Sequence, residues 1–157
     1  MPFETAPTYI FDLHCDTLDR LALHKSFSDA GFMEQDAAIP DARMSSLASN
    51  GCHIALDRMA KAQYAWCQCF AAFIPDHMSA DWGWQVFCVV RDFFQSQLAE
   101  HAALIEQVRD ARDIRGIVDS GKCAGMFTVE GGSFIEGSLD RLHAAADAGV
   151  KMLTLTW

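Results

Sequence analysis

Short apolar runs alternate along the chain with segments in which apolar residues recur every three or four positions. The runs combine β-branched, aromatic and cysteine residues and end at glycine, proline or polar residues, which is typical of strands. Strands are expected at residues 9–15, 64–74, 123–129 and 150–156. Helices are expected after Thr17, which is a possible N-cap, over 81–110 with Asp81 as the cap, over 56–62 and 113–120, and between Ser138 and Gly149. A further short helix is expected within 40–48.

The alternation of strands and helices predicts the fold class. Strand–helix–strand order implies parallel strands joined by right-handed crossovers, and the run at 64–74 is apolar enough to be buried on both faces. The pattern therefore predicts an α/β fold of the parallel (β/α)8 TIM-barrel type. A complete barrel takes about 250 residues. Residues 1–157 are accordingly expected to form one domain with the first four strand–helix units, leaving the last strand as an open edge.

Composition narrows the class of protein. The 157 residues are 51% hydrophobic and 21% charged, which suffices for a sizeable core. A formal net charge of -9 argues against nucleic acid or an anionic membrane as a partner, because no basic patch is available to neutralise phosphates. Neither a membrane-spanning run nor a signal peptide is recognisable, so a cytoplasmic location is expected. In that reducing compartment the six cysteines are expected to be free thiols.

Candidate metal ligands follow two of the expected strands. His14 and Asp16 lie two positions apart at the end of the first strand, so their side chains would point the same way. Cys15, between them, would face the opposite way, toward the covering helices. Glu130 ends the third strand, and the two glycines after it allow a sharp turn. Because the carboxyl ends of parallel strands share one edge, these side chains are expected to meet there. A carboxylate so placed could bridge two cations about 3.5–4 Å apart.

Ordinary structural roles remain open for each of these residues. A His-x-Asp pair often arises by chance at a polar strand end, and Glu130 could be a turn acid held by backbone amides. Asp76 and His77, after the second strand, are interpreted as loop residues. No nucleotide-binding glycine loop is present, and no Ser/His/Asp or Cys/His nucleophile arrangement can be assembled.

Four motifs in order add a resemblance to a known family. They are DLHCDTL at 12–18, QCFAAFI at 68–74, VEGG at 129–132 and GVKMLTLTW at 149–157. Together they resemble the membrane (renal) dipeptidase family of zinc peptidases, over nearly the whole chain. The resemblance implies the N-terminal half of a (β/α)8 barrel that binds two zinc ions and hydrolyses dipeptides.

The same resemblance implies roles for individual residues. His14 and Asp16 would bind the first zinc, and Glu130 would be the catalytic-site carboxylate that bridges both ions. A metal-bound water in this binuclear site would attack the scissile carbonyl of the dipeptide substrate. In the family, the other zinc takes two histidines from later strands, which have no counterpart here. Trp157 and Ser133 stand where some members carry histidine.

Three hypotheses follow for the function. The first is a zinc-dependent dipeptidase for which this chain supplies part of the metal centre. The second is a non-catalytic half-barrel that forms a homo-oligomer by covering its open strand. The third is another metal-dependent hydrolase of the same barrel class that uses His14, Asp16 and Glu130.

Overall fold

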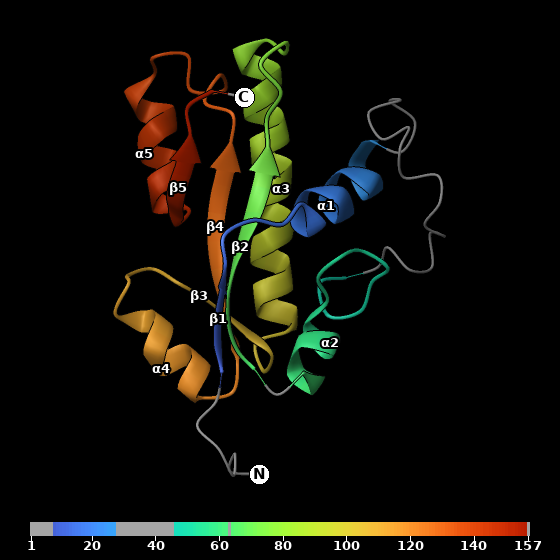
Figure 1. The fold of residues 1–157 in the computed structure, drawn as a ribbon. Coiled ribbons are helices and arrows are strands. Elements are labelled where there is room, and N and C mark those ends of the chain that lie inside the picture. The colour runs from blue at the N-terminus through green and yellow to red at the C-terminus, as the bar shows by residue number, and fades with distance from the viewer. Residues whose placement is uncertain (1–7, 28–45, 63, 157) are drawn as a thin grey trace.

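Strands and helices alternate along the chain in the computed structural model, which describes residues 8–27, 46–62 and 64–156 (Figure 1). The strands in these residues are β1 (Tyr9–Asp12), β2 (Ala65–Phe73), β3 (Ile105–Gln107), β4 (Cys123–Glu130) and β5 (Val150–Thr154). The helices are α1 (Thr17–Phe27), α2 (Leu56–Lys61), α3 (Ala80–Glu100), α4 (Asp113–Asp119) and α5 (Leu139–Asp147).

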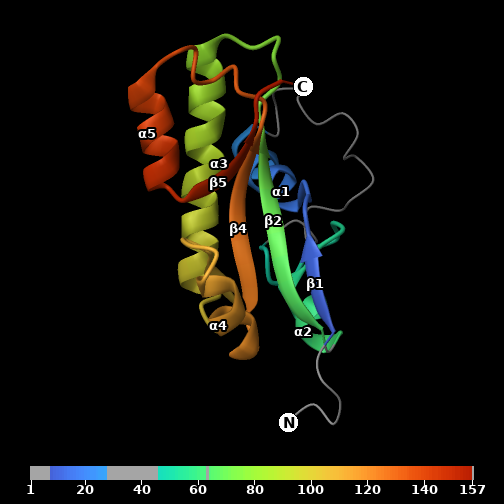
Figure 2. The ribbon, with the colours of Figure 1, turned by 60° about the vertical axis from the view of Figure 1, so that its left-hand side comes forward.

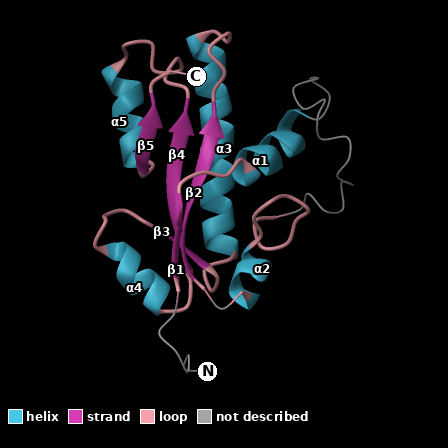
Figure 3. Cartoon of the chain, viewed as in Figure 1, coloured by secondary structure: helices cyan, strands magenta, loops and turns pink. Residues whose placement is uncertain are grey.

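The strands form one parallel sheet, which confirms the predicted fold class. β2 lies between β1 and β4, while β3 and β5 both pair with β4. β3 pairs with the first residues of β4, and β5 with its last four. The arrowheads of β2, β4 and β5 therefore lie at one edge of the sheet (Figure 3).

The two faces of the sheet are covered differently. Phe70 and Phe127 point to the face covered by α3, where they join the main core with Phe87 and Phe94. Residues of opposite parity, such as Cys67 and Ala124, face the other way and pack against α4. That second cluster lies at the starting ends of β2 and β4, and Figure 2 shows α4 at this end of the sheet. α4 therefore leaves uncovered the edge of the sheet at which β2, β4 and β5 end, which is called the carboxyl edge below.

One expected helix is shorter than predicted, and a strand takes its place. The apolar spacing predicts a helix over 81–110, but α3 ends at Glu100 and β3 follows. Cys123 donates to the carbonyl of Leu104, and Val108 donates to that of Gly125. These bonds outweigh the helical preference of the alanines just before β3, because local propensity is weaker than pairing with a neighbouring strand.

Three smaller predictions at element boundaries also need correction. The first strand ends at Asp12 rather than at residue 15, and its side chains are exposed or half-buried because β1 is an edge strand. Ser79, rather than Asp81, caps α3 by accepting a hydrogen bond from Trp82. Thr17 is the first residue of α1, and its hydroxyl accepts a bond from Ile54 instead of capping the helix. The short helix expected within 40–48 lies largely outside the described residues.

The cysteines are free thiols, as the sequence predicts. All six cysteines are free, and every one except the partly buried Cys88 is buried, as expected for structural thiols. Burial raises the pKa of the Cys15 thiol to about 12 and that of Cys67 to about 11. These thiols therefore remain protonated at neutral pH.

Among the described residues, no helix combines the length and the apolar character that crossing a membrane requires.

The turn after β4 is enclosed by two neighbouring strands. Ile74 donates to the carbonyl of Glu130, and Gly131 donates to the carbonyl of Thr154 in β5. Gly131 has a φ of 100°, a backbone conformation that favours glycine. A Cβ atom at this position would lie far inside van der Waals contact with the carbonyl oxygen of Ile74. This glycine therefore fixes how closely the ends of β2 and β4 approach.

Replacing Gly131 with alanine is predicted to lower the free energy of unfolding by more than about 3 kcal/mol, because backbone strain adds to a steric clash. Gly121→Ala is a matched control: its φ is also positive, at 85°, but nothing lies within 4 Å of the added carbon. It should lose only about 1–2 kcal/mol. Urea unfolding measures both values, and equal losses would contradict the enclosed turn.

Candidate metal centre

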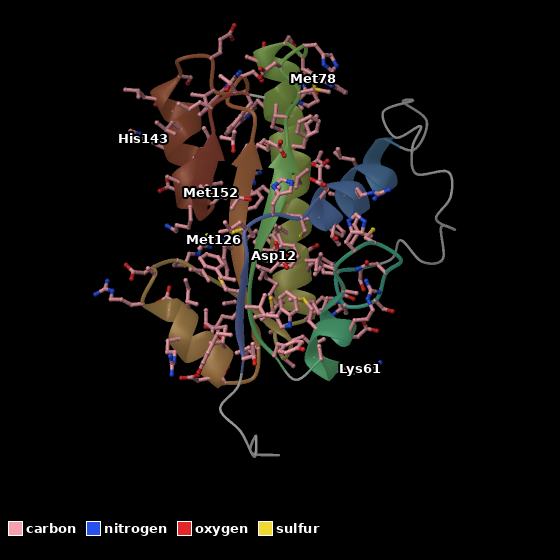
Figure 4. All side chains as sticks on the ribbon, viewed as in Figure 1. Asp12, Lys61, Met78, Met126, His143 and Met152 are labelled. Atoms are coloured by element: carbon pink, nitrogen blue, oxygen red, sulfur yellow. The ribbon has the colours of Figure 1, made fainter. Side chains whose placement is uncertain are left out.

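The segment after β1 presents two polar side chains to solvent and one thiol to the core. The His14 amide donates to the Asp12 carboxylate at 3.2 Å, which bends the chain where β1 ends. Figure 4 labels Asp12 at this point. The chain then pairs with β2 again, because the Cys15 amide donates to the carbonyl of Cys69 and the Cys15 carbonyl accepts from the amide of Ala71. Cys15 is buried in the main core, as expected, whereas His14 and Asp16 are exposed on either side of it.

Glu130 meets this pair from the end of β4. The strands β2 and β4 pair without interruption up to Phe73 and Glu130, so the carboxylate reaches the same edge as the β1–α1 segment. Nε2 of His14 lies 2.9 Å from Oδ1 of Asp16 and 3.4 Å from Oε2 of Glu130. One ligand atom from each residue lies within 4.8 Å of the other two. The structure thus brings together the three predicted ligands.

The donor set suits a divalent metal ion. One imidazole nitrogen and two carboxylates are ligands that zinc accepts, and together they carry two negative charges when the histidine is neutral. The side chains are 46% exposed in His14, 52% in Asp16 and 23% in Glu130, so an ion from solution can reach them. In the part of the chain that the structure describes, no other group of three possible ligands converges in this way. Asp76 and His77 are exposed and lie outside the group, in line with their interpretation as loop residues.

Asp19, for which the sequence pattern predicted no role, lies buried near this group. It belongs to the first turn of α1, is only 6% exposed, and accepts a hydrogen bond from the amide of Phe73 at 3.2 Å. The pKa of its carboxyl group is raised to about 8, mainly by burial; the hydrogen bond from Phe73 opposes the shift, and the charges of Asp16 and Glu130 add to it. Its position in the sequence could have indicated burial, because the apolar residues Ala22 and Leu23 follow three and four positions later and so share its helix face.

Thr128 is a second polar residue near the group. It lies two positions before Glu130 on β4, and therefore on the same face of the sheet. Its hydroxyl is buried and has no hydrogen-bond partner within the described residues. A buried polar group without a partner is unusual in proteins. The sequence offered no signal for it, because threonine is common in strands.

The sequence matches the family described as membrane dipeptidase, peptidase family M19, over residues 5–157. The chain therefore belongs to this family, which confirms the resemblance. A search of curated proteins finds no significant match.

Solved structures show the same fold. Dipeptidase AC, a metallopeptidase of family M19, superposes with a TM-score of 0.73 at 20% identity, covering 97% of this chain and 44% of its own. A Rhodobacter sphaeroides metallopeptidase, liganded with a phosphinate mimic of the dipeptide L-Ala-D-Ala, gives 0.73 at 19% identity, with 97% and 46% covered. The probable dipeptidase PvdM of Pseudomonas aeruginosa gives 0.65 at 11% identity, with 98% and 35% covered. The chain thus spans less than half the length of these proteins.

Asp19 is predicted to make the stability of the metal-free chain depend on pH. Its pKa is raised from the ordinary value of 3.8 to about 8, so the folded state binds a proton that the unfolded state releases. Stability from this group is complete below about pH 4 and is lost as pH rises through about 8. Asp19→Asn removes this loss, so its advantage over the wild type should grow between those values.

Urea unfolding in the presence of a chelator, at intervals across that range, measures the difference. Asp140→Asn is the matched control, since Asp140 is also in the first turn of a helix but is exposed. Its stability should follow the wild type at every pH. A constant offset between Asp19→Asn and the wild type would contradict the buried, raised-pKa carboxyl group.

Proposed function

We propose that this chain supplies the first half of the active site of a zinc-dependent dipeptidase. In this proposal residues 1–157 are the N-terminal half of a metallodipeptidase-like barrel. The observation that carries it is the convergence of His14, Asp16 and Glu130 within 4.8 Å at the carboxyl edge of a parallel sheet. Family membership supports the same function. The dipeptide mimic bound to the Rhodobacter sphaeroides metallopeptidase supports a dipeptide as substrate class.

Each residue has a distinct role in the proposed centre. His14 and Asp16 would hold the first zinc, and Glu130 would be the carboxylate shared between this ion and a second zinc. Asp12 accepts a hydrogen bond from the His14 amide and so helps to hold the backbone at this ligand. Bound zinc supplies Lewis acidity toward the scissile carbonyl and lowers the pKa of water toward neutrality. The remaining ligands of the second ion would come from the other half of the barrel.

The cellular location is part of the proposal. Six free cysteines, five of them buried, fit a protein that folds in a reducing compartment. We therefore place the enzyme in the cytoplasm.

Zinc binding tests the role of the three ligands directly. His14→Ala and Glu130→Gln are each predicted to weaken zinc affinity of the chain by at least about tenfold, because partners that merely orient a ligand already change affinity 10–100-fold. His143→Ala is the control, since this histidine is exposed on α5 and lies away from the β1–α1 segment (Figure 4). Isothermal titration with zinc provides the measurement. Equal affinity in all four proteins would refute the assignment of the ligands.

Hydrolysis of dipeptides tests the function itself. The protein expressed from its full natural reading frame should cleave simple dipeptides, lose this activity with a chelator and regain it with zinc. Glu130→Gln should lower kcat/KM by at least about 100-fold, since it replaces a charged carboxylate ligand with a neutral amide that has only one ligand oxygen. Cleavage of other amides without any dipeptide would instead favour a different metal-dependent hydrolase of this barrel class.

A further inference from the structure

Successive backbone amides of β2 donate alternately to the strand on one side and to the strand on the other. The amide of Phe73, the last residue of β2, instead donates to a side chain. Ile74, just beyond the strand, donates toward β4, to the carbonyl of Glu130 at 2.8 Å. On the opposite side, Ala71 donates to the carbonyl of Cys15 at 3.1 Å. Phe73 is the next amide on that side, and by then the chain after β1 has turned into α1. Its partner is the side chain of Asp19, at 3.2 Å.

The Asp19 carboxylate thus takes the place of a strand residue. A parallel ladder offers a backbone carbonyl to every second amide, and an unpaired buried amide destabilises the fold by about 1–3 kcal/mol. Asp19 supplies the missing acceptor although α1 runs away from the sheet. The bond joins the first turn of α1 to the end of β2.

We propose that Asp19 is a positioning residue of the metal centre, which holds the β1–α1 ligands at a fixed distance from Glu130 through the Phe73 amide. Asp19 follows Asp16 by three residues in a helix whose first bond runs from Arg20 to the Asp16 carbonyl. Phe73 is in register with Glu130 on the neighbouring strand. One side-chain bond therefore ties the segment that carries His14 and Asp16 to the strand β2, which pairs directly with Glu130.

The burial of Asp19 supports a functional role over a purely structural one. An asparagine has the same shape and keeps the acceptor oxygen, yet avoids burying an ionisable group beside Asp16 and Glu130, both of which raise its pKa. Residues that reduce the stability of the empty protein are typical of functional sites. Two cations in the centre would offset the repulsion among the three carboxylates.

This inference rests on the proposed metal centre, so its test includes a measurement that needs no metal. Asp19→Asn retains the acceptor for Phe73, whereas Asp19→Ala removes it. In the zinc-free chain, the Phe73 amide should exchange with solvent at least about tenfold faster in Asp19→Ala than in Asp19→Asn. The amide chemical shifts of Glu130 and Gly131 should change in Asp19→Ala and stay close to the wild type in Asp19→Asn.

Zinc titration of the same proteins completes the test. Asp19→Ala should bind zinc at least about tenfold more weakly than Asp19→Asn, because only the asparagine keeps an acceptor for the Phe73 amide. Equal exchange, shifts and affinity in the two variants would overturn the positioning role. If the wild type binds no zinc, the proposed function fails, while exchange and shifts still decide whether Asp19 fixes the end of β4. Asp19→Leu, which fills the buried position without an acceptor, replaces Asp19→Ala if that variant does not fold.

Discussion

The pairing of β2 with β4 is the constraint on which the rest of this structure depends. The ladder runs without interruption from Cys67 and Ala124 to Phe73 and Glu130, so both strands end at one edge. α3 packs on one face of this pair, and α4 on the other face near its start. The chain after β1 reaches the same edge by pairing Cys15 with β2. A slip of one residue between β2 and β4 would turn Glu130 to the opposite face and separate it from His14.

Several carboxyl groups lie close together at this edge of the sheet. Asp16 and Glu130 lie on either side of His14, and both raise the pKa of the buried Asp19. Gathering carboxylates in one place is unfavourable unless a cation or protons offset their charge. Below about pH 8 the proton held by Asp19 removes one of these charges. A divalent ion would offset the charges of Asp16 and Glu130 as well, which is the physical basis for interpreting the group as a candidate metal centre.

The sequence predicted the parts of this structure that depend on local pattern. Apolar runs identified β2 and β4 nearly to the residue, and the period of two placed His14 and Asp16 on the opposite side from Cys15. β3 escaped prediction because three residues carry too little pattern, and pairing with β4 decides their conformation. Asp19 escaped because its partner is a backbone amide 54 positions away. Such a contact becomes visible only once the sheet is assembled.

The backbone and the side chains of the proposed ligands are restrained to different degrees, and this division suits metal binding. The carbonyl of Asp16 accepts the first bond of α1, and the carbonyl of Glu130 accepts a bond from Ile74. The carboxylates of the same residues are 52% and 23% exposed. A rigid main chain limits the entropy lost when an ion binds, while exposed side chains allow the ion to enter from water. Hydrogen bonds therefore hold the backbone at these two carboxylates in place, while their side chains stay accessible to an ion from solution.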